Sequence, residues 1–176
     1  MDLLFKNLVW PAIAGNVAWS FFSVAIGEQL SCSVVARLTT LLLIAIYLMA
    51  AWVRDREAQS KLAYFTLDGI FAIAIATAAI ATGAAGTATS WTASGAVIAI
   101  FGVSALGHVF KVWDPQRPSR QRNLLAAANG IGILIVAITA KTAPTFVLWS
   151  HVGGIAAVLV VLACLWNYVP VKNGGG

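Results

Sequence analysis

Six long runs of apolar residues, joined by short polar segments, constrain the fold of this sequence more than any other feature. A helix needs roughly 20 apolar residues to cross the hydrocarbon core of a bilayer, which is about 30 Å thick. Each run is long enough for one crossing, and no connection has room for a separate folded domain. The sequence therefore predicts an all-α bundle of six transmembrane helices that forms a single domain over residues 1–173. The predicted spans are residues 8–27, 33–53, 62–82, 89–112, 123–140 and 145–168.

The composition excludes a soluble domain. Of the 176 residues, 60% are hydrophobic and only 10% are charged, and the mean hydropathy is +0.88. A soluble domain carries about 25% charged residues, so this chain has too few polar side chains to cover its surface in water. The net charge of +5 does not indicate nucleic-acid binding, because the cations lie in short clusters between the apolar runs.

The two ends of the sequence carry separate expectations. No small-residue cleavage site follows the first apolar run, so we expect a retained helix rather than a signal peptide. The final Gly174–Gly176 has no structural logic, and we expect it to be a linker remnant.

The distribution of Lys and Arg predicts the orientation. Nine of the eleven fall on one side of the predicted bundle: Lys6, Arg54, Arg56, Lys61, Lys111, Arg117, Arg120, Arg122 and Lys172. Only Arg37 and Lys141 fall on the other side. Because cations in short loops favour the cytoplasmic side, both termini and the basic loops are predicted to be cytoplasmic. The basic loop 114–122 is also expected to contact anionic lipid headgroups.

Tryptophans mark the predicted ends of the spans. An interfacial belt is the expected place for Trp10, Trp52, Trp91, Trp113, Trp149 and Trp166. Trp19 falls inside its span, so we expect it to pack against neighbouring helices.

Part of the chain repeats itself. Residues 79–100 and 137–158 align without gaps, with matches that include Thr87/Thr145, Trp91/Trp149 and Gly95/Gly153. The pattern predicts three tandem hairpins, of which the first has diverged most. Each repeat has an even number of spans, so the repeats are parallel, which argues against inverted-repeat transporters with a midplane substrate site.

The hairpins also open on a common step, in which an amide or carboxyl side chain lies beside a glycine, as at Asp68-Gly69-Ile70 and Asn129-Gly130-Ile131. Three such hairpins with Trp- and Gly-bearing return helices resemble the HdeD-like family of small bacterial membrane proteins. The resemblance covers residues 62–168, and the first hairpin fits it poorly. It implies a six-span inner-membrane protein with a role in acid or envelope stress tolerance, and it brings no catalytic residues.

Four polar side chains lie within the predicted spans near the cytoplasmic side: Asp68, His108, Asn16 and Asn129. Ionisable groups inside a membrane are costly and are functional candidates by default. Asp68 could form an interhelical contact, with His108 or a cation, or could titrate at a cytoplasmic vestibule. The asparagines favour packing, because an amide clamps helices by hydrogen bonding and does not titrate. His108 could likewise sense pH or simply be hydrogen-bonded.

Four more polar residues are candidates at the outer side: Glu28, Arg37, His151 and Lys141. A Glu28–Arg37 pair, extended by His151, could pin or gate this side, and pinning is the reading we favour.

The sequence carries no enzyme signature. Cys32 and Cys164 are far apart, and the two histidines lie at opposite sides, so neither a redox pair nor a metal or haem site is predicted. No nucleophile elbow or phosphate-binding loop is present. We therefore expect a protein that is not an enzyme and has no cofactor.

Small residues are abundant in the spans, as in Gly95 with Ala99 and Gly153-Gly154 with Ala157. They permit close helix packing or a homo-oligomer in the bilayer, or they could line a pore. Three functions follow as hypotheses. The first is a non-enzymatic stress-tolerance protein, the second a small channel or facilitator for a neutral solute or protons, and the third an accessory subunit of a larger membrane complex.

Overall fold

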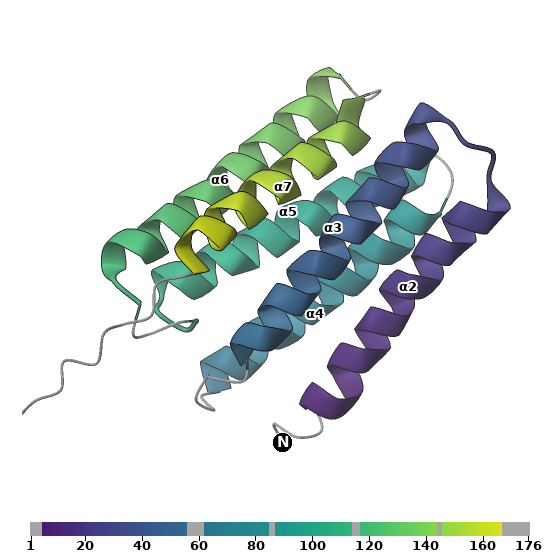
Figure 1. Cartoon of the computed structure of the whole chain (residues 1–176). Helices are drawn as coiled ribbons and strands as arrows, with labels where there is room; N and C mark the ends of the chain where they lie inside the picture. The colour runs from purple at the N-terminus through teal and green to yellow at the C-terminus, as the bar shows by residue number, and fades with distance from the viewer. Residues whose placement is uncertain (1–4, 56–61, 85–86, 114–116, 144–145, 167–176) are drawn as a thin grey trace, which may run out of the picture.

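A computed structural model of the chain consists of long helices at all six predicted spans (Figure 1). The structure describes residues 5–55, 62–84, 87–113, 117–143 and 146–166, and no strand occurs among them. A π-helical turn, η1 (Phe5–Val9), leads into α2 (Trp10–Gly27), and α3 (Cys32–Asp55), α4 (Leu62–Gly83), α5 (Thr87–Val109), α6 (Ser119–Thr142) and α7 (Val147–Trp166) follow. Six of these helical segments are long and apolar enough to cross a membrane.

The end of α5 and the start of α6 differ most from the predicted spans. Helix α5 ends at Val109 rather than at residue 112, because the chain turns at Lys111, which has a φ of 56°. Helix α6 begins at Ser119 rather than at residue 123. Pro118 precedes it without the loss of a helical hydrogen bond, because the first N–H groups of a helix have no intrahelical partner. Arg120 and Arg122 therefore lie on α6 and not in a loop.

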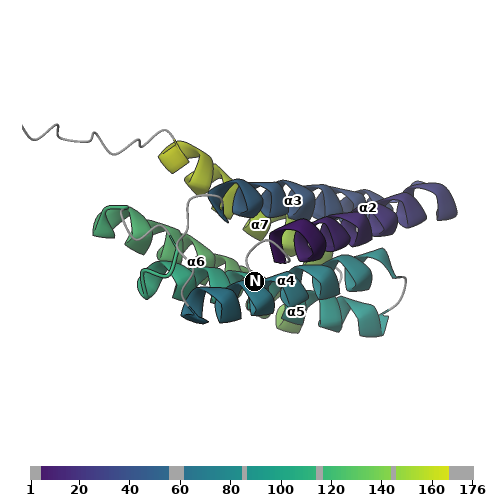
Figure 2. The ribbon, with the colours of Figure 1, turned by 90° about the horizontal axis from the view of Figure 1, so that it is seen from below.

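The six helices form two layers of three (Figure 2). Helices α2, α3 and α7 make one layer and α4, α5 and α6 the other, with contacts between layers from α2 to α4, α3 to α4, α5 to α7 and α6 to α7. Successive helices alternate in direction (Figure 1). We name the end of the bundle at Asp55, Leu62, Val109 and Ser119 the basic end. The opposite end, at Gly27, Cys32, Gly83 and Thr142, is the neutral end.

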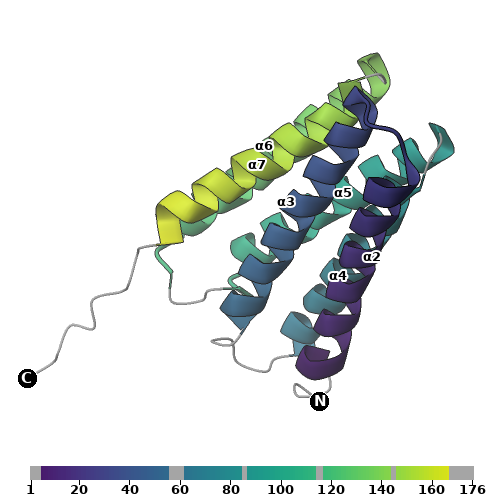
Figure 3. The same cartoon turned by 45° about the vertical axis from the view of Figure 1, so that its right-hand side comes forward.

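The α6–α7 hairpin leans away from the first three long helices. Figure 3 shows α7 close to α3 near the neutral end and farther from it toward the basic end. Large side chains nevertheless fill the interior along its length. The fully buried ones include Leu41, Phe71, Ile75, Val97, Phe101, Leu125 and Val136.

Three of the tryptophan predictions are wrong. Trp10 and Trp113 are 3% and 1% exposed and lie in the core instead of an interfacial belt. Trp19 is 75% exposed, because α2 packs on one side only and Trp19 lies on its opposite face. Trp91 and Trp149 are exposed near the neutral end, as a belt requires. The side chains of Trp52 and Trp166 lie outside the described part of the structure.

Candidate functional site

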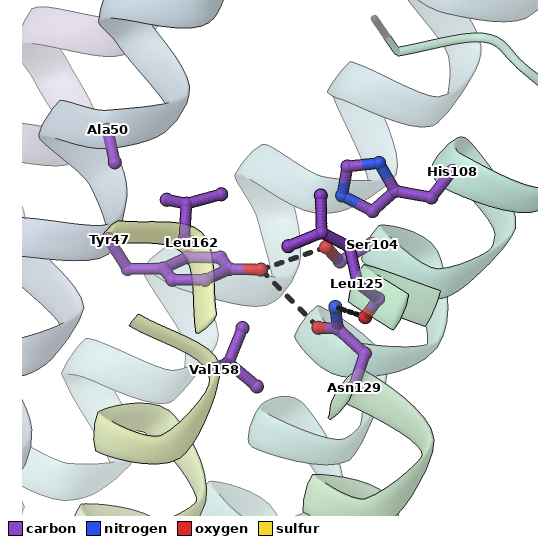
Figure 4. Close-up of a pocket in the computed structure, with 8 residues that line it drawn as sticks. All are labelled: Tyr47, Ala50, Ser104, His108, Leu125, Asn129, Val158 and Leu162. Atoms are coloured by element: carbon purple, nitrogen blue, oxygen red, sulfur yellow. Dashed lines mark hydrogen bonds between the residues drawn. The ribbon is translucent and has the colours of Figure 1, made fainter. Parts of the chain in front are cut away.

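One group of buried polar side chains lies in the half of the bundle nearer the basic end. Tyr47 on α3, Ser104 and His108 on α5, and Asn129 on α6 point toward one another around a small pocket (Figure 4). Leu125 of α6 and Val158 of α7 complete its walls, and the half-buried Ala50 and Leu162 form its rim. The pocket therefore draws on four helices, α3, α5, α6 and α7.

Hydrogen bonds join three of these helices across the pocket. The Tyr47 hydroxyl lies 2.9 Å from Ser104 Oγ and 3.5 Å from Asn129 Oδ1, and its single proton serves one of them at a time. Asn129 Nδ2 donates to the carbonyl of Leu125 at 2.7 Å. The Nδ2 bond stays within α6, so Asn129 reaches another helix through the longer contact of its Oδ1 with the Tyr47 hydroxyl.

The pocket is matched in size to a single water molecule. The free space open to a water-sized molecule is about 10 Å³, and a buried water needs about 10–15 Å³ by this measure. The pocket in this conformation therefore takes nothing larger than a water-sized molecule.

Asp68 lies on α4 in the same half of the bundle and accepts a hydrogen bond from an unexpected donor. Beyond α5 the chain folds back, and the backbone N–H groups of Val112 and Trp113 both donate to the carbonyl of Gly107, at 3.0 and 3.1 Å. The turn carries the Trp113 ring into the bundle, where its Nε1 donates to Asp68 Oδ1 at 3.1 Å. The partner expected for Asp68 from the sequence is His108 or a cation, and the structure places an indole there instead.

An aromatic cluster connects this turn to the other helices. We define it as Trp10, Tyr47, Phe71, His108 and Trp113. The Phe71 ring lies 5.3 Å from that of Trp113, 5.7 Å from Tyr47 and 6.4 Å from Trp10. His108 packs edge-to-face on Trp113 at 5.9 Å. His108 is thus shared by the aromatic cluster and the pocket, and this places three predicted candidates, Asp68, His108 and Asn129, in one region.

Asn16, the fourth candidate in this half, does not join them. Its side chain is half-buried on α2, and its Oδ1 has no hydrogen-bond partner among the described residues. The contact that Asn129 Oδ1 makes with the Tyr47 hydroxyl is therefore not repeated at Asn16.

The predicted Glu28–Arg37 pair is present at the neutral end. Arg37 Nη1 donates to the two carboxylate oxygens of Glu28 at 2.7 and 2.6 Å. Its Nε and Nη2 donate to the carbonyls of Thr82 and Gly83 at 2.7 and 2.5 Å. Arg37 therefore ties the α2–α3 turn to the last turn of α4, where free carbonyls and the helix dipole favour a cation.

The two other candidates at the neutral end stay apart from this pair. His151 is fully buried on α7 and lies 3.0 Å, through its Nε2, from Ser94 Oγ on α5. His151 Nδ1 has no hydrogen-bond partner among the described residues. Lys141 is exposed in the last turn of α6. The expected extension of the Glu28–Arg37 pair to His151 is therefore wrong.

Sequence reasoning missed several residues that hold the site together. Uncharged polar side chains do not stand out in an apolar span, and this applies to Tyr47, Ser94 and Trp113. Arg122 was expected in a basic loop that contacts lipid headgroups, yet it is 6% exposed and its Nη1 donates to the carbonyl of Arg117. Arg117 in turn donates to the carbonyl of Leu165 at 3.1 Å and so ties the segment before α6 to the end of α7.

Two glycines in the middle of the bundle show whether small residues there serve close packing or line a pore. A Cβ at Gly132 would lie 2.8 Å from Cε2 of Phe101, and one at Gly154 would lie 3.3 Å from the same atom. The Phe101 ring therefore fills the space that these two glycines leave. At these positions the small residues serve close packing and do not line an open pore.

Among the described residues, no three His, Cys, Asp or Glu side chains are grouped so that they could hold a metal ion. Comparisons of the chain with protein-family models, with curated proteins and with solved structures gave no match.

Proposed function

We propose that this chain is a non-enzymatic multi-pass membrane protein of the HdeD-like kind that acts in acid or envelope stress tolerance. The observation that supports it best is the closed interior. Arg37 braces the neutral end, the hydrogen bond from Trp113 to Asp68 braces the basic end, and Phe101 fills the middle. A bundle held in this way contributes to the membrane as a packed body and needs no open passage.

The proposal includes a place and an orientation. The protein lies in the inner membrane, its basic end and both termini face the cytoplasm, and its outer surface contacts lipid. Gly95, Gly153 and Ala157 are exposed on α5 and α7. Small exposed residues of this kind allow close approach of a second copy in the bilayer, which supports a homo-oligomer.

Two measurements test this proposal. A strain that lacks the protein should survive acid shock less well than its parent, and the wild-type gene should restore survival. Purified wild-type protein in liposomes should give no proton or neutral-solute flux above empty liposomes at pH 5 and pH 7. Unchanged survival in the deletion strain would contradict the stress role, and flux through the wild-type protein would favour a facilitator. Protein that is unstable once purified would favour an accessory subunit.

A small facilitator for protons or a neutral solute is the second candidate. The pocket favours it, because Tyr47, Ser104, His108 and Asn129 bring four buried hydrogen-bonding groups to one place at the basic end. Polar side chains at membrane depth mark solute and proton pathways in many membrane proteins.

The variant Asp68→Asn separates the two candidates. The asparagine keeps an oxygen that can accept the hydrogen bond from Trp113 Nε1, and it removes the carboxylate. The stress-tolerance proposal predicts a change in thermal stability only, of about 1 kcal/mol or less, the typical net value of one hydrogen bond. The facilitator proposal predicts altered liposome flux from a protein that melts at the wild-type temperature. Trp113→Phe, which removes the donor and keeps an aromatic ring, is the matched control.

A further inference from the structure

One face of α5 runs through the interior from end to end. Its buried side chains follow at spacings of three or four residues, which places them on one side of a helix. From the neutral end to the basic end they are Ser94, Val97, Phe101, Ser104 and His108, and each is at most 3% exposed. The face is therefore polar at both ends and apolar in the middle.

Each polar end has partners on the neighbouring helices. Ser94 meets His151 of α7 at 3.0 Å near the neutral end. Ser104 and His108 face the pocket near the basic end, with Asn129 of α6 and Tyr47 of α3. Ser94 and His108 each lie seven residues from Phe101, which is about 10 Å along a helix that rises 1.5 Å per residue.

Phe101 stands between these two polar groups. Its ring occupies the notch left by Gly132 of α6 and Gly154 of α7, and Val136 lies next to Gly154. Val97, Val136 and Ile155 are also buried in this middle section. The Phe101 ring is the largest fully buried side chain in this section, so a change of its rotamer would open more space than a change at any of these valine or isoleucine side chains.

We propose that the interior between α5, α6 and α7 is a proton path that Phe101 holds shut. When the ring leaves its notch, water enters between the pocket and the Ser94–His151 pair, and protons cross along hydrogen-bonded water. They enter at one end and leave at the other down their gradient, so no bond of the protein is made or broken. This activity goes beyond a stress role that depends on a packed bundle alone.

The side chains along the path favour protons over larger or charged solutes. The pocket holds about one water molecule. Histidine, tyrosine, serine and asparagine side chains each donate and accept hydrogen bonds, as a chain of water molecules requires. No Asp, Glu, Lys or Arg occurs within residues 94–108, 129–140 or 151–162, so an ion other than a proton would meet no opposite charge there.

The test is the proton flux of Phe101→Ala in liposomes that contain a pH-sensitive dye, with potassium and valinomycin to balance charge. We expect at least a tenfold higher flux than through the wild-type protein at the same protein-to-lipid ratio. Phe71→Ala is the matched control, because Phe71 is as deeply buried but lies on α4, outside the interior between α5, α6 and α7. Its flux should stay at the wild-type level. Adding His151→Leu to Phe101→Ala should return the flux toward the wild-type level.

Two results would overturn the proposal. One is a folded Phe101→Ala protein whose proton flux equals that of wild type, and the other is an equal proton flux through Phe101→Ala and Phe71→Ala. If Phe101→Ala does not fold, Phe101→Leu replaces it, since leucine keeps an apolar side chain and removes the ring, and the same tenfold criterion holds. The proton flux of the wild-type protein tests the proposed function, whereas the ratio of the variant's flux to the wild-type flux tests the closure by Phe101. Either proposal can therefore fail while the other stands.

Discussion

Gly107 leaves room for the Trp113 ring because it has no side chain. A Cβ at this position would collide with the Trp113 ring, which packs directly on the α5 backbone. The fold-back turn, the burial of Trp113 and its hydrogen bond to Asp68 all depend on this close approach. A residue with no polar atom in its side chain thus allows the Trp113 indole to reach the Asp68 carboxylate.

Gly107→Ala should lower the free energy of unfolding by about 1–3 kcal/mol, the usual cost of overpacking a core. Gly102→Ala is the matched control on the same helix, because no atom lies within 4 Å of a Cβ placed there. Alanine is the better helix former by about 1 kcal/mol, so this variant should be as stable as wild type or more so. Thermal unfolding in detergent measures both. Equal stability of the two variants would show that the ring is not held against Gly107.

At the scale of elements, the end of α4 is held by a side chain of α3. Arg37 is 7% exposed and donates to two carbonyls of the last turn of α4 as well as to Glu28. The side chain of Glu28 is 32% exposed, so water can replace much of the interaction of its carboxylate with Arg37. The two partners of this ion pair should therefore differ widely in their contribution to stability.

Arg37→Leu should cost about 3–5 kcal/mol, as breaking a buried ionic contact does, and Glu28→Gln about 1 kcal/mol or less, as for a partly exposed pair. Unfolding in detergent measures the difference, and hydrogen exchange should increase at Thr82 and Gly83 in Arg37→Leu only. Similar losses in the two variants would mean that the carbonyl contacts of Arg37 add nothing.

The helices themselves could be predicted from sequence, but the faces that they turn inward could not. Length and hydropathy suffice to find a span, because the thickness of a bilayer fixes the number of consecutive apolar residues that a helix needs to cross it. A helix that is apolar all round gives no sign of which side is buried. Trp19 and Tyr47 illustrate this: the first was expected inside and is exposed, and the second lines the pocket and was overlooked.

Turns between helices set a second limit. Trp113 looked like a membrane-interface residue because it follows a span. Its burial depends on the left-handed backbone at Lys111 and on the two hydrogen bonds to the Gly107 carbonyl, which no local pattern announced. In contrast, Glu28 and Arg37 could be paired in advance, because opposite charges on either side of a short turn have few other partners.

At the scale of the whole molecule, the two ends of the bundle differ in charge. Described cations such as Lys111, Arg117, Arg120 and Arg122 lie at the basic end, and Lys141 lies at the neutral end. The rule that cations in short loops stay in the cytoplasm then predicts the orientation of the entire bundle.

Thiol labelling in intact cells tests this orientation. Cys32 is exposed at the start of α3, at the neutral end, and should react with a membrane-impermeant maleimide in cells that keep only this cysteine after Cys164→Ser. A protein with Cys32→Ser, Cys164→Ser and Ser119→Cys should react only after the membrane is permeabilised. The reverse pattern would invert the orientation.

The hydrogen bonds of Tyr47 have a consequence for how the protein is made. Tyr47 and Asn129 are 82 residues apart, and synthesis at about 5–20 residues per second separates their arrival in the membrane by roughly 4–16 s. Ser104, the nearer partner, follows Tyr47 by 57 residues. The bonds of Tyr47 to Ser104 and Asn129 therefore form only after α5 and α6 have entered the membrane. The first hairpin must therefore be inserted and held in the membrane before α5 and α6 arrive to complete this network.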